Sequence, residues 1–133
     1  MLYVDSLINI YEKGKTKMKK MTIDTATVYN PAAHYGCTCM RFHGKEETGA
    51  SKFWIGQSIF LPGGGAEYAY NDNPLEKVYY VLEGEMTVTD DAGTEYVIHA
   101  DECISFPPNE GRYLENKSRK PARMLVIINY PEA

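Results

Sequence analysis

The feature that most constrains the fold of this chain is a succession of short apolar runs, each closed by a turn signal, from residue 22 onward. The runs are rich in Val, Ile, Tyr, Phe and Thr, which favour strands, and no segment carries a long helical pattern. Expected strands cover residues 25–29, 38–43, 53–61, 66–71, 78–82, 85–89, 94–99, 103–106, 112–115 and 123–130, with turns at 62–65, 71–74, 83–84, 90–93 and 107–109. This spacing predicts an all-β protein, an antiparallel sandwich or barrel.

Two regions of different character divide the chain. At 133 residues it fits one domain, which we assign to residues 22–133. Residues 1–21 combine apolar residues at loose helical spacing with a lysine-rich stretch. This segment is either a flexible or weakly helical extension or an arm that packs on a partner subunit.

The charge balance and the cysteine count exclude several classes of partner. The net charge of −4 argues against a nucleic-acid partner, which requires a basic face. No apolar run approaches the roughly 18 residues that cross a bilayer. An odd number of cysteines, 3, without a secretion signal predicts a reduced, cytoplasmic protein.

A glycine-rich turn and the strand that follows it resemble the first motif of the cupin superfamily. In that motif a glycine is followed by His-x-His, then by glutamate, then by a second glycine. Gly65 and Gly84 hold the two glycine positions with matching spacing. Asn71 and Asn73 stand at the two histidine positions, and Lys77 stands at the glutamate position.

The second cupin motif is present in the same incomplete way. Pro107 and Asn116 match its proline and asparagine. Asp101 and Asn109 stand where glycines are usual, and asparagine tolerates the left-handed backbone that such a turn requires. Arg112 stands at the histidine position.

The resemblance covers residues 53–130 and implies a double-stranded β-barrel, or jelly roll, that forms a homodimer. The usual cupin site is a divalent metal ion held inside the barrel by three histidines and one glutamate. None of the four positions in this chain holds its usual ligand. A lysine and an arginine put positive charge where the metal would lie, so we predict no metal and no cofactor at this position.

The substitutions themselves predict a different ligand. Two cations inside a barrel are costly unless they are paired, and an anionic small molecule between Lys77 and Arg112 would pair them. Asn71 and Asn73 would add hydrogen bonds. Burial beside Arg112 should lower the pKa of Lys77, which could then act as a general base or form a Schiff base. The alternative is structural: Glu76 or another carboxylate neutralises Lys77, and Arg112 bridges strands.

Two further residues are candidates for the same pocket. Tyr79 shares a face with Lys77 in an extended strand, so it should point into the pocket. Gln57 is a polar residue among apolar strand neighbours, which either faces solvent or lines a site.

A second hypothesis concerns four residues of metal-ligating type. His34, Cys37, Cys39 and His43 are closely spaced, although the spacing matches no known zinc pattern. Buried cysteines in the core or at a dimer interface are the alternative, and Cys103 is expected in the core as well.

These observations leave three functions open. The first is a metal-independent isomerase, lyase or cyclase that acts on a small anionic or aromatic molecule. The second is a non-catalytic small-molecule binding or sensor protein that uses the same pocket. The third is a structural module that has lost its site, which the polar residues at the pocket positions argue against.

Overall fold

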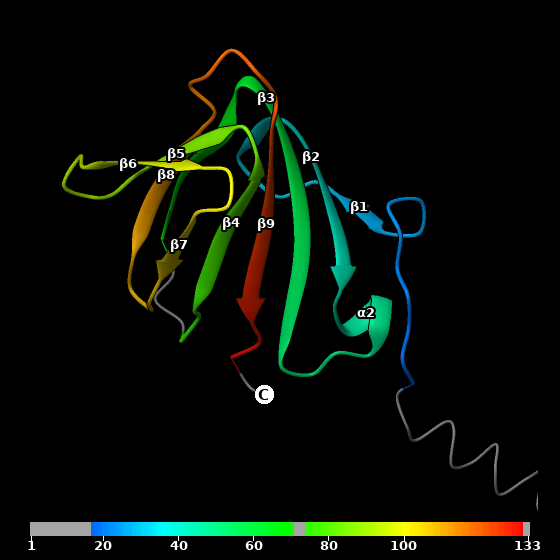
Figure 1. The fold of residues 1–133 in the computed structure, drawn as a ribbon. Helices are drawn as coiled ribbons and strands as arrows, with labels where there is room; N and C mark the ends of the chain where they lie inside the picture. Colours follow the sequence, from blue (N-terminus) through cyan, green and yellow to red (C-terminus); the bar gives the residue numbers. More distant parts are fainter. Residues whose placement is uncertain (1–16, 71–73, 132–133) are drawn as a thin grey trace, which may run out of the picture.

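The computed structural model describes residues 17–70 and 74–131 and is almost entirely β. One short helix, α2 (Lys45–Thr48), interrupts the strands. The strands are β1 (Thr27–Tyr29), β2 (His34–His43), β3 (Phe53–Tyr70), β4 (Lys77–Glu83), β5 (Glu85–Thr89), β6 (Glu95–His99), β7 (Cys103–Phe106), β8 (Gly111–Glu115) and β9 (Ala122–Asn129). Figure 1 shows them wrapped into a barrel with α2 at the end of β2.

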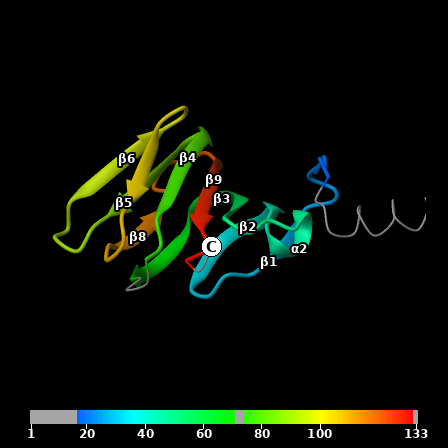
Figure 2. The same ribbon diagram turned by 90° about the horizontal axis from the view of Figure 1, so that it is seen from below.

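The long strand β3 organises the barrel. Its first half pairs with β9 and β2, and its second half pairs with β8 and the start of β2. The hydrogen-bonded order is β6-β5-β8-β3-β9-β4-β7, and in the described part of the chain each of these neighbouring pairs is antiparallel. In Figures 1 and 2, β5, β6 and β8 lie on one side of the molecule, and β1 and β2 lie on the other side, beyond β3. The predicted double-stranded β-barrel is confirmed.

Alternation along the strands places the core inside the barrel. In β4 the buried residues are Lys77, Tyr79 and Val81, at every second position. In β9 the residues Met124 and Val126 follow the same rule. Because successive strand side chains point to opposite faces, the inward rows of several strands meet in one apolar interior.

The turn expected at residues 62–65 is not a turn, because these residues lie within β3. Its glycines serve close packing of backbones instead. A Cβ atom on Gly65 would collide with the carbonyl oxygen of Leu114 on β8, and one on Gly64 would collide with Gly36 on β2. The glycines that predicted a turn are therefore required by the close packing of three strands.

The turns that carry the cupin resemblance adopt the expected backbone. Gly84, Asp101 and Asn109 have φ angles of 76°, 68° and 67°. Asparagine and aspartate reach this left-handed region more easily than other non-glycine residues. The substitution of glycine by Asn109 and Asp101 therefore keeps the turns of the family motif.

A buried carboxylate fastens α2 to the edge of the barrel. Glu47 is 5% exposed. It accepts hydrogen bonds from Arg41 Nε on β2 at 2.7 Å and from Thr27 Oγ1 on β1 at 2.8 Å. The guanidinium group of Arg41 holds the pKa of Glu47 below its usual range, although burial opposes this effect.

Most of the predicted N-terminal extension, residues 1–21, lies outside the described residues, and its boundary stays a prediction. Residues 17–21 form no helix or strand. Lys19 Nζ donates a hydrogen bond to the backbone oxygen of Glu47 at 2.6 Å. In the described part of the chain, no helix has the length and apolar character needed to cross a bilayer.

Candidate functional site

A small cavity lies inside the barrel, with a volume of about 170 Å³. Strands β1, β2, β3, β4, β8 and β9 all contribute to its wall. Its lining residues are Tyr29, Pro31, His34, Trp54, Ser58, Phe60, Lys77, Tyr79, Arg112, Leu114, Met124, Val126 and Ile128. The wall is thus mainly aromatic and apolar, with three basic side chains and no carboxylate among the described lining residues.

Lys77 reaches this cavity because it is the first inward-facing residue of β4. It is 7% exposed. It has no hydrogen bond and no ion pair within the described residues, and its Nζ lies 5.4 Å from the ring centre of Phe106 and 5.9 Å from that of Tyr79. Burial and, to a smaller extent, the charge of Arg112 lower the pKa of Lys77 to about 8. The alternative in which Glu76 neutralises Lys77 is wrong, because no such ion pair forms.

Arg112 is held rigidly from β8, and it is 4% exposed. Its Nε donates to Tyr79 Oη on β4 at 3.0 Å, and its Nη1 donates to the backbone oxygen of Glu67 on β3 at 2.9 Å. Arg112 therefore does bridge strands, as the structural alternative predicted. Both of its partners are neutral, so the positive charge of the guanidinium group has no carboxylate partner among the described residues.

His34 is the third basic group, and it comes from the first position of β2. Its Nδ1 lies 2.8 Å from the backbone oxygen of Ala32. A carbonyl oxygen only accepts, so Nδ1 carries the proton and Nε2 carries the lone pair in the neutral ring. Burial lowers the pKa of His34, and the charges of Arg112 and Lys77 lower it further, while the bond to Ala32 opposes them.

The second hypothesis was a metal site formed by four residues of β2, and the structure does not bring these four side chains together. Cys37 and Cys39 do share a face, with their Sγ atoms 3.9 Å apart. A register shift between Arg41 and His43 breaks the alternation, and His43 Nδ1 lies 2.9 Å from Thr48 Oγ1. Among the described residues, no group of three or more His, Cys, Asp or Glu side chains is placed to hold a metal ion.

The other candidate residues have different outcomes. Tyr79 points into the cavity, as expected. Asn71 and Asn73 lie outside the described residues. Gln57 pairs with Met40 and Leu125, on the face of β3 opposite the cavity-lining Ser58, so the structure does not bring it to this site.

Of the usual cupin ligand positions, the two that the structure describes, Lys77 and Arg112, do not fit a metal ion. Lys77 and Arg112 offer only donor groups, and Arg112 is always protonated in proteins. A cation placed between them would be repelled by both charges. This pair of side chains therefore does not suit a metal ion at the position that one holds in the usual cupin site.

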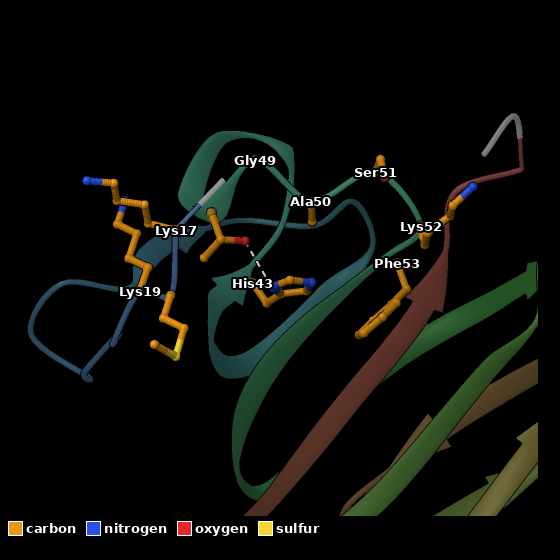
Figure 3. A pocket seen from close by; sticks show the side chains of 10 residues that line it. Lys17, Lys19, His43, Gly49, Ala50, Ser51, Lys52 and Phe53 are labelled. Atoms are coloured by element: carbon orange, nitrogen blue, oxygen red, sulfur yellow. Dashed lines mark hydrogen bonds between the residues drawn. The ribbon is translucent and has the colours of Figure 1, made fainter. Parts of the chain in front are cut away.

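A larger hollow of about 520 Å³ lies at the surface beside α2 (Figure 3), and it shares no lining residue with the barrel cavity. Its lining includes Lys17, Lys19, His43, Lys52 and Phe53. Figure 3 shows the ammonium groups of Lys17 and Lys52 on opposite sides of the hollow. Because its charged groups do not converge, we place the functional site in the barrel.

Comparison with known sequences agrees with this fold. A family model described as the cupin domain matches residues 56–128. Beta-D-galactosidase Rv1717 of Mycobacterium tuberculosis (strain ATCC 25618 / H37Rv) is 35% identical over 116 residues, which cover 87% of this chain and 97% of that protein.

Solved structures match the barrel at lower identity. The polyketide cyclase RemF from Streptomyces resistomycificus gives a TM-score of 0.74 with 21% identity, and the match covers 85% of this chain and 80% of that one. A sugar phosphate isomerase from Silicibacter pomeroyi gives 0.69 with 24% identity, covering 84% and 76%. A predicted oxalate decarboxylase from Thermotoga maritima gives 0.70 with 17% identity, covering 84% and 98%. These likenesses establish the fold and nothing finer.

Proposed function

The chain belongs to the cupin family, and from this premise we propose that its barrel binds a small anionic molecule between Lys77 and Arg112 without a metal ion. The observation that carries this proposal is Lys77. It is a buried lysine at the cavity wall, with neither an ion pair nor a hydrogen bond in the described part of the chain. An unpaired buried charge is expensive, and a bound carboxylate or phosphate would offset this cost.

The neighbouring side chains support an anion with an apolar or aromatic body. Arg112 Nη2 makes no hydrogen bond to the described residues, so it can donate to an anionic oxygen. The aromatic residues Tyr29, Trp54 and Phe60 also line the cavity. A cavity of about 170 Å³ is close in volume to an engineered protein cavity that binds benzene. A ligand of that size would be enclosed, and a larger one would protrude.

We propose further that the bound molecule undergoes isomerase-, lyase- or cyclase-type chemistry that needs no metal ion. Where such a reaction proceeds through an enolate, negative charge develops on an oxygen atom. A cation fixed in a dry cavity stabilises such charge far more than it would in water. Lys77 has this role in our proposal, and Arg112 holds the anionic group. Two proteins of similar structure, the polyketide cyclase and the sugar phosphate isomerase, have names compatible with this class.

The direct test is ligand binding by the purified protein, with its metal content measured on the same sample. We expect pyruvate, benzoate or inorganic phosphate to bind by isothermal titration calorimetry without stoichiometric metal. Lys77→Met and Arg112→Met should each weaken binding by at least about tenfold, the effect of losing one charge-assisted contact. Lys52→Met removes a lysine outside the cavity and is the control. A full complement of metal in the barrel, or binding indifferent to both cavity variants, would contradict the proposal.

The named activity of the mycobacterial relative supplies a second candidate, hydrolysis of β-D-galactosides. Its support is the 35% identity over nearly the whole length of both chains. Glycoside hydrolysis usually employs a pair of carboxylates, and the described lining of the cavity has none. An assay with nitrophenyl β-D-galactoside decides between the candidates: turnover that survives in Lys77→Met and Arg112→Met would favour a hydrolase with a different site.

The non-catalytic alternative is a binding or sensor protein that uses the same cavity. The pH dependence of ligand affinity distinguishes a non-catalytic binding protein from an enzyme. A pure anion binder should hold its ligand as pH falls from 8 toward 6, because Lys77, with a pKa of about 8, becomes fully charged.

We also propose a homodimer and a cytoplasmic location, the latter because all 3 cysteines are free thiols.

A further inference from the structure

We propose that His34 is the base that removes a proton from a carbon atom of the bound anion, and that the ligand class is a small enolisable carboxylate such as a 2-oxo acid. This inference rests on the binding mode proposed above. Its starting point is that the described lining of the cavity includes three basic side chains, Lys77, Arg112 and His34, of which His34 is the one fitted to accept a proton.

The hydrogen bond to Ala32 fixes which nitrogen of His34 is free. Nδ1 donates to the backbone oxygen at 2.8 Å, so the lone pair lies on Nε2. Nε2 has no hydrogen-bond partner within the described residues. A backbone partner that orients the ring and sets its tautomer is the arrangement that a histidine base requires.

The charged and titratable groups around His34 keep it neutral. Lys77 and Tyr79 face the cavity from β4, Arg112 from β8 and Tyr29 from β1. Burial and the two cations lower the pKa of His34 below its usual value near 6.5. Lys77, with a pKa of about 8, is mostly charged at pH 7. Burial raises the pKa of Tyr29, so its hydroxyl stays protonated.

These protonation states give the His34 imidazole and the Lys77 ammonium group different roles. Paired groups whose environments push their pKa values apart are the usual mark of an acid–base assignment. At neutral pH, His34 is a neutral acceptor, whereas Lys77 is a cation. The general base expected at Lys77 from the sequence therefore fits His34 better, and Lys77 fits the role of charge stabiliser.

The proposed step balances without a co-reactant. The C–H bond next to the carbonyl group breaks, and its proton moves to His34 Nε2. The electron pair of that bond forms a carbon–carbon double bond, while the carbonyl oxygen becomes an enolate beside Lys77. Return of the proton to carbon regenerates the base. If the deprotonated carbon carries a hydroxyl group, that hydroxyl loses its proton to the former carbonyl oxygen, and return of the carbon-bound proton to the former carbonyl carbon gives an isomer. Loss of a leaving group from the carbon next to the deprotonated carbon gives a lyase product.

The experiment follows deuterium exchange into the methyl group of pyruvate, and into C3 of 2-oxobutyrate, in D2O by proton NMR. We expect the wild-type protein to accelerate exchange and His34→Asn to lose about 10²–10⁴-fold of that rate, the usual contribution of a general base. The asparagine amide can still donate to Ala32. His99→Asn replaces an exposed histidine on β6 and should exchange like wild type. Pyruvate affinity, measured by calorimetry, should be unchanged in His34→Asn.

The pH–rate profile identifies the base independently. Exchange should rise through a pKa below 6.5 as His34 loses its proton, and it should fall near pH 8 as Lys77 loses its charge. A rate that instead rises through pH 8 would assign the base to Lys77 and overturn the inference. So would a borohydride-trapped adduct of pyruvate on Lys77, detected by mass spectrometry of the intact protein.

Failure of this inference is distinct from failure of the binding proposal. If pyruvate binds and Lys77→Met weakens it, but neither acid exchanges, the cavity binds anions and His34 is not a base toward this class. If His34→Asn exchanges as fast as wild type, the base lies elsewhere. If no carboxylate or phosphate binds at all, both proposals are overturned.

Discussion

Lys77 makes the strongest prediction at the scale of single residues, because its buried charge should destabilise the fold. Its pKa is about 8 in the folded protein against about 10.5 when unfolded, so protonated Lys77 costs roughly 3 kcal/mol below pH 8. We expect Lys77→Met to raise the free energy of unfolding by about 1–3 kcal/mol at pH 7, where methionine replaces the unpaired cation with an apolar side chain. Urea denaturation of both proteins measures this difference in the free energy of unfolding.

The sign of the pH dependence follows from proton binding. Between pH 8 and pH 10.5 the unfolded chain binds more protons at Lys77 than the folded chain does, so wild-type stability from this group rises with pH. The advantage of Lys77→Met should therefore shrink across that window. Lys52→Met, at the surface hollow, should stay within about 0.5 kcal/mol of wild type. A Lys77→Met variant less stable than wild type at pH 7 would indicate a hidden partner for the ammonium group.

Residue positions inside the motifs were predictable, whereas those outside them were not. Lys77, Tyr79 and Arg112 reach the cavity because motif spacing fixes both the strand and its inward face. His34 carries no such local signal, since its place depends on the pairing of β2 with the second half of β3. Cys103 was expected in the core but is exposed, because Ile104 and Phe106 on β7 take the inward direction.

At the scale of elements, the attachment of α2 should depend on Glu47. We expect Glu47→Gln to lower the free energy of unfolding by about 2–4 kcal/mol at neutral pH, because it leaves the Arg41 guanidinium group without its buried partner. Glu46→Gln is the matched control. Glu46 also lies within ion-pair distance of Arg41, at 3.6 Å, but its side chain is 82% exposed, so its loss should cost well under about 1 kcal/mol.

Acid should erase the difference between wild type and Glu47→Gln. The folded pKa of Glu47 is below the usual 4.5, so its contribution is complete above that pH and is lost as the pH falls through the folded value. Thermal unfolding of both proteins between pH 7 and pH 3 tests this. A constant difference in stability over that range would mean that the Glu47 charge is not what holds α2.

The strands themselves follow the sequence pattern closely. β5 and β7 begin and end where the pattern predicted, at Glu85–Thr89 and Cys103–Phe106. The pattern failed at residues 62–65, where glycine can equally serve a turn or a close approach of two backbones. Only the neighbouring strands, which are distant in sequence, distinguish these uses.

At the scale of the whole molecule, the outer face of the β2-β3-β9-β4 sheet supports the homodimer prediction. Residues with their side chains on this face alternate with those that line the cavity. They include Ile55, Ile59, Val78, Leu125 and Ile127, all only half-buried in the single chain. Gln57 lies in the same rows with a buried Oε1 that has no hydrogen-bond partner among the described residues. A second copy would cover these apolar side chains.

Sedimentation of the wild-type protein at micromolar concentration should therefore give a dimer. Ile127→Glu places a charge in the outer face and should yield a folded monomer, checked by circular dichroism. Val97→Glu, on the half-exposed face of β6, is the matched control and should stay dimeric. A monomeric wild type would refute the homodimer prediction without affecting the cavity.

The double membership of β3 has a consequence for how the chain acquires its structure. Phe53, at the start of β3, pairs with Asn129, whereas Tyr70, at its end, pairs with Gly111. These contacts close long loops, and such topologies fold in milliseconds to seconds rather than microseconds. Because β3 pairs with β9 at its start and with β8 at its end, both halves of the barrel need this strand. A chain cut within β3 should therefore yield two fragments that fold only when they are mixed.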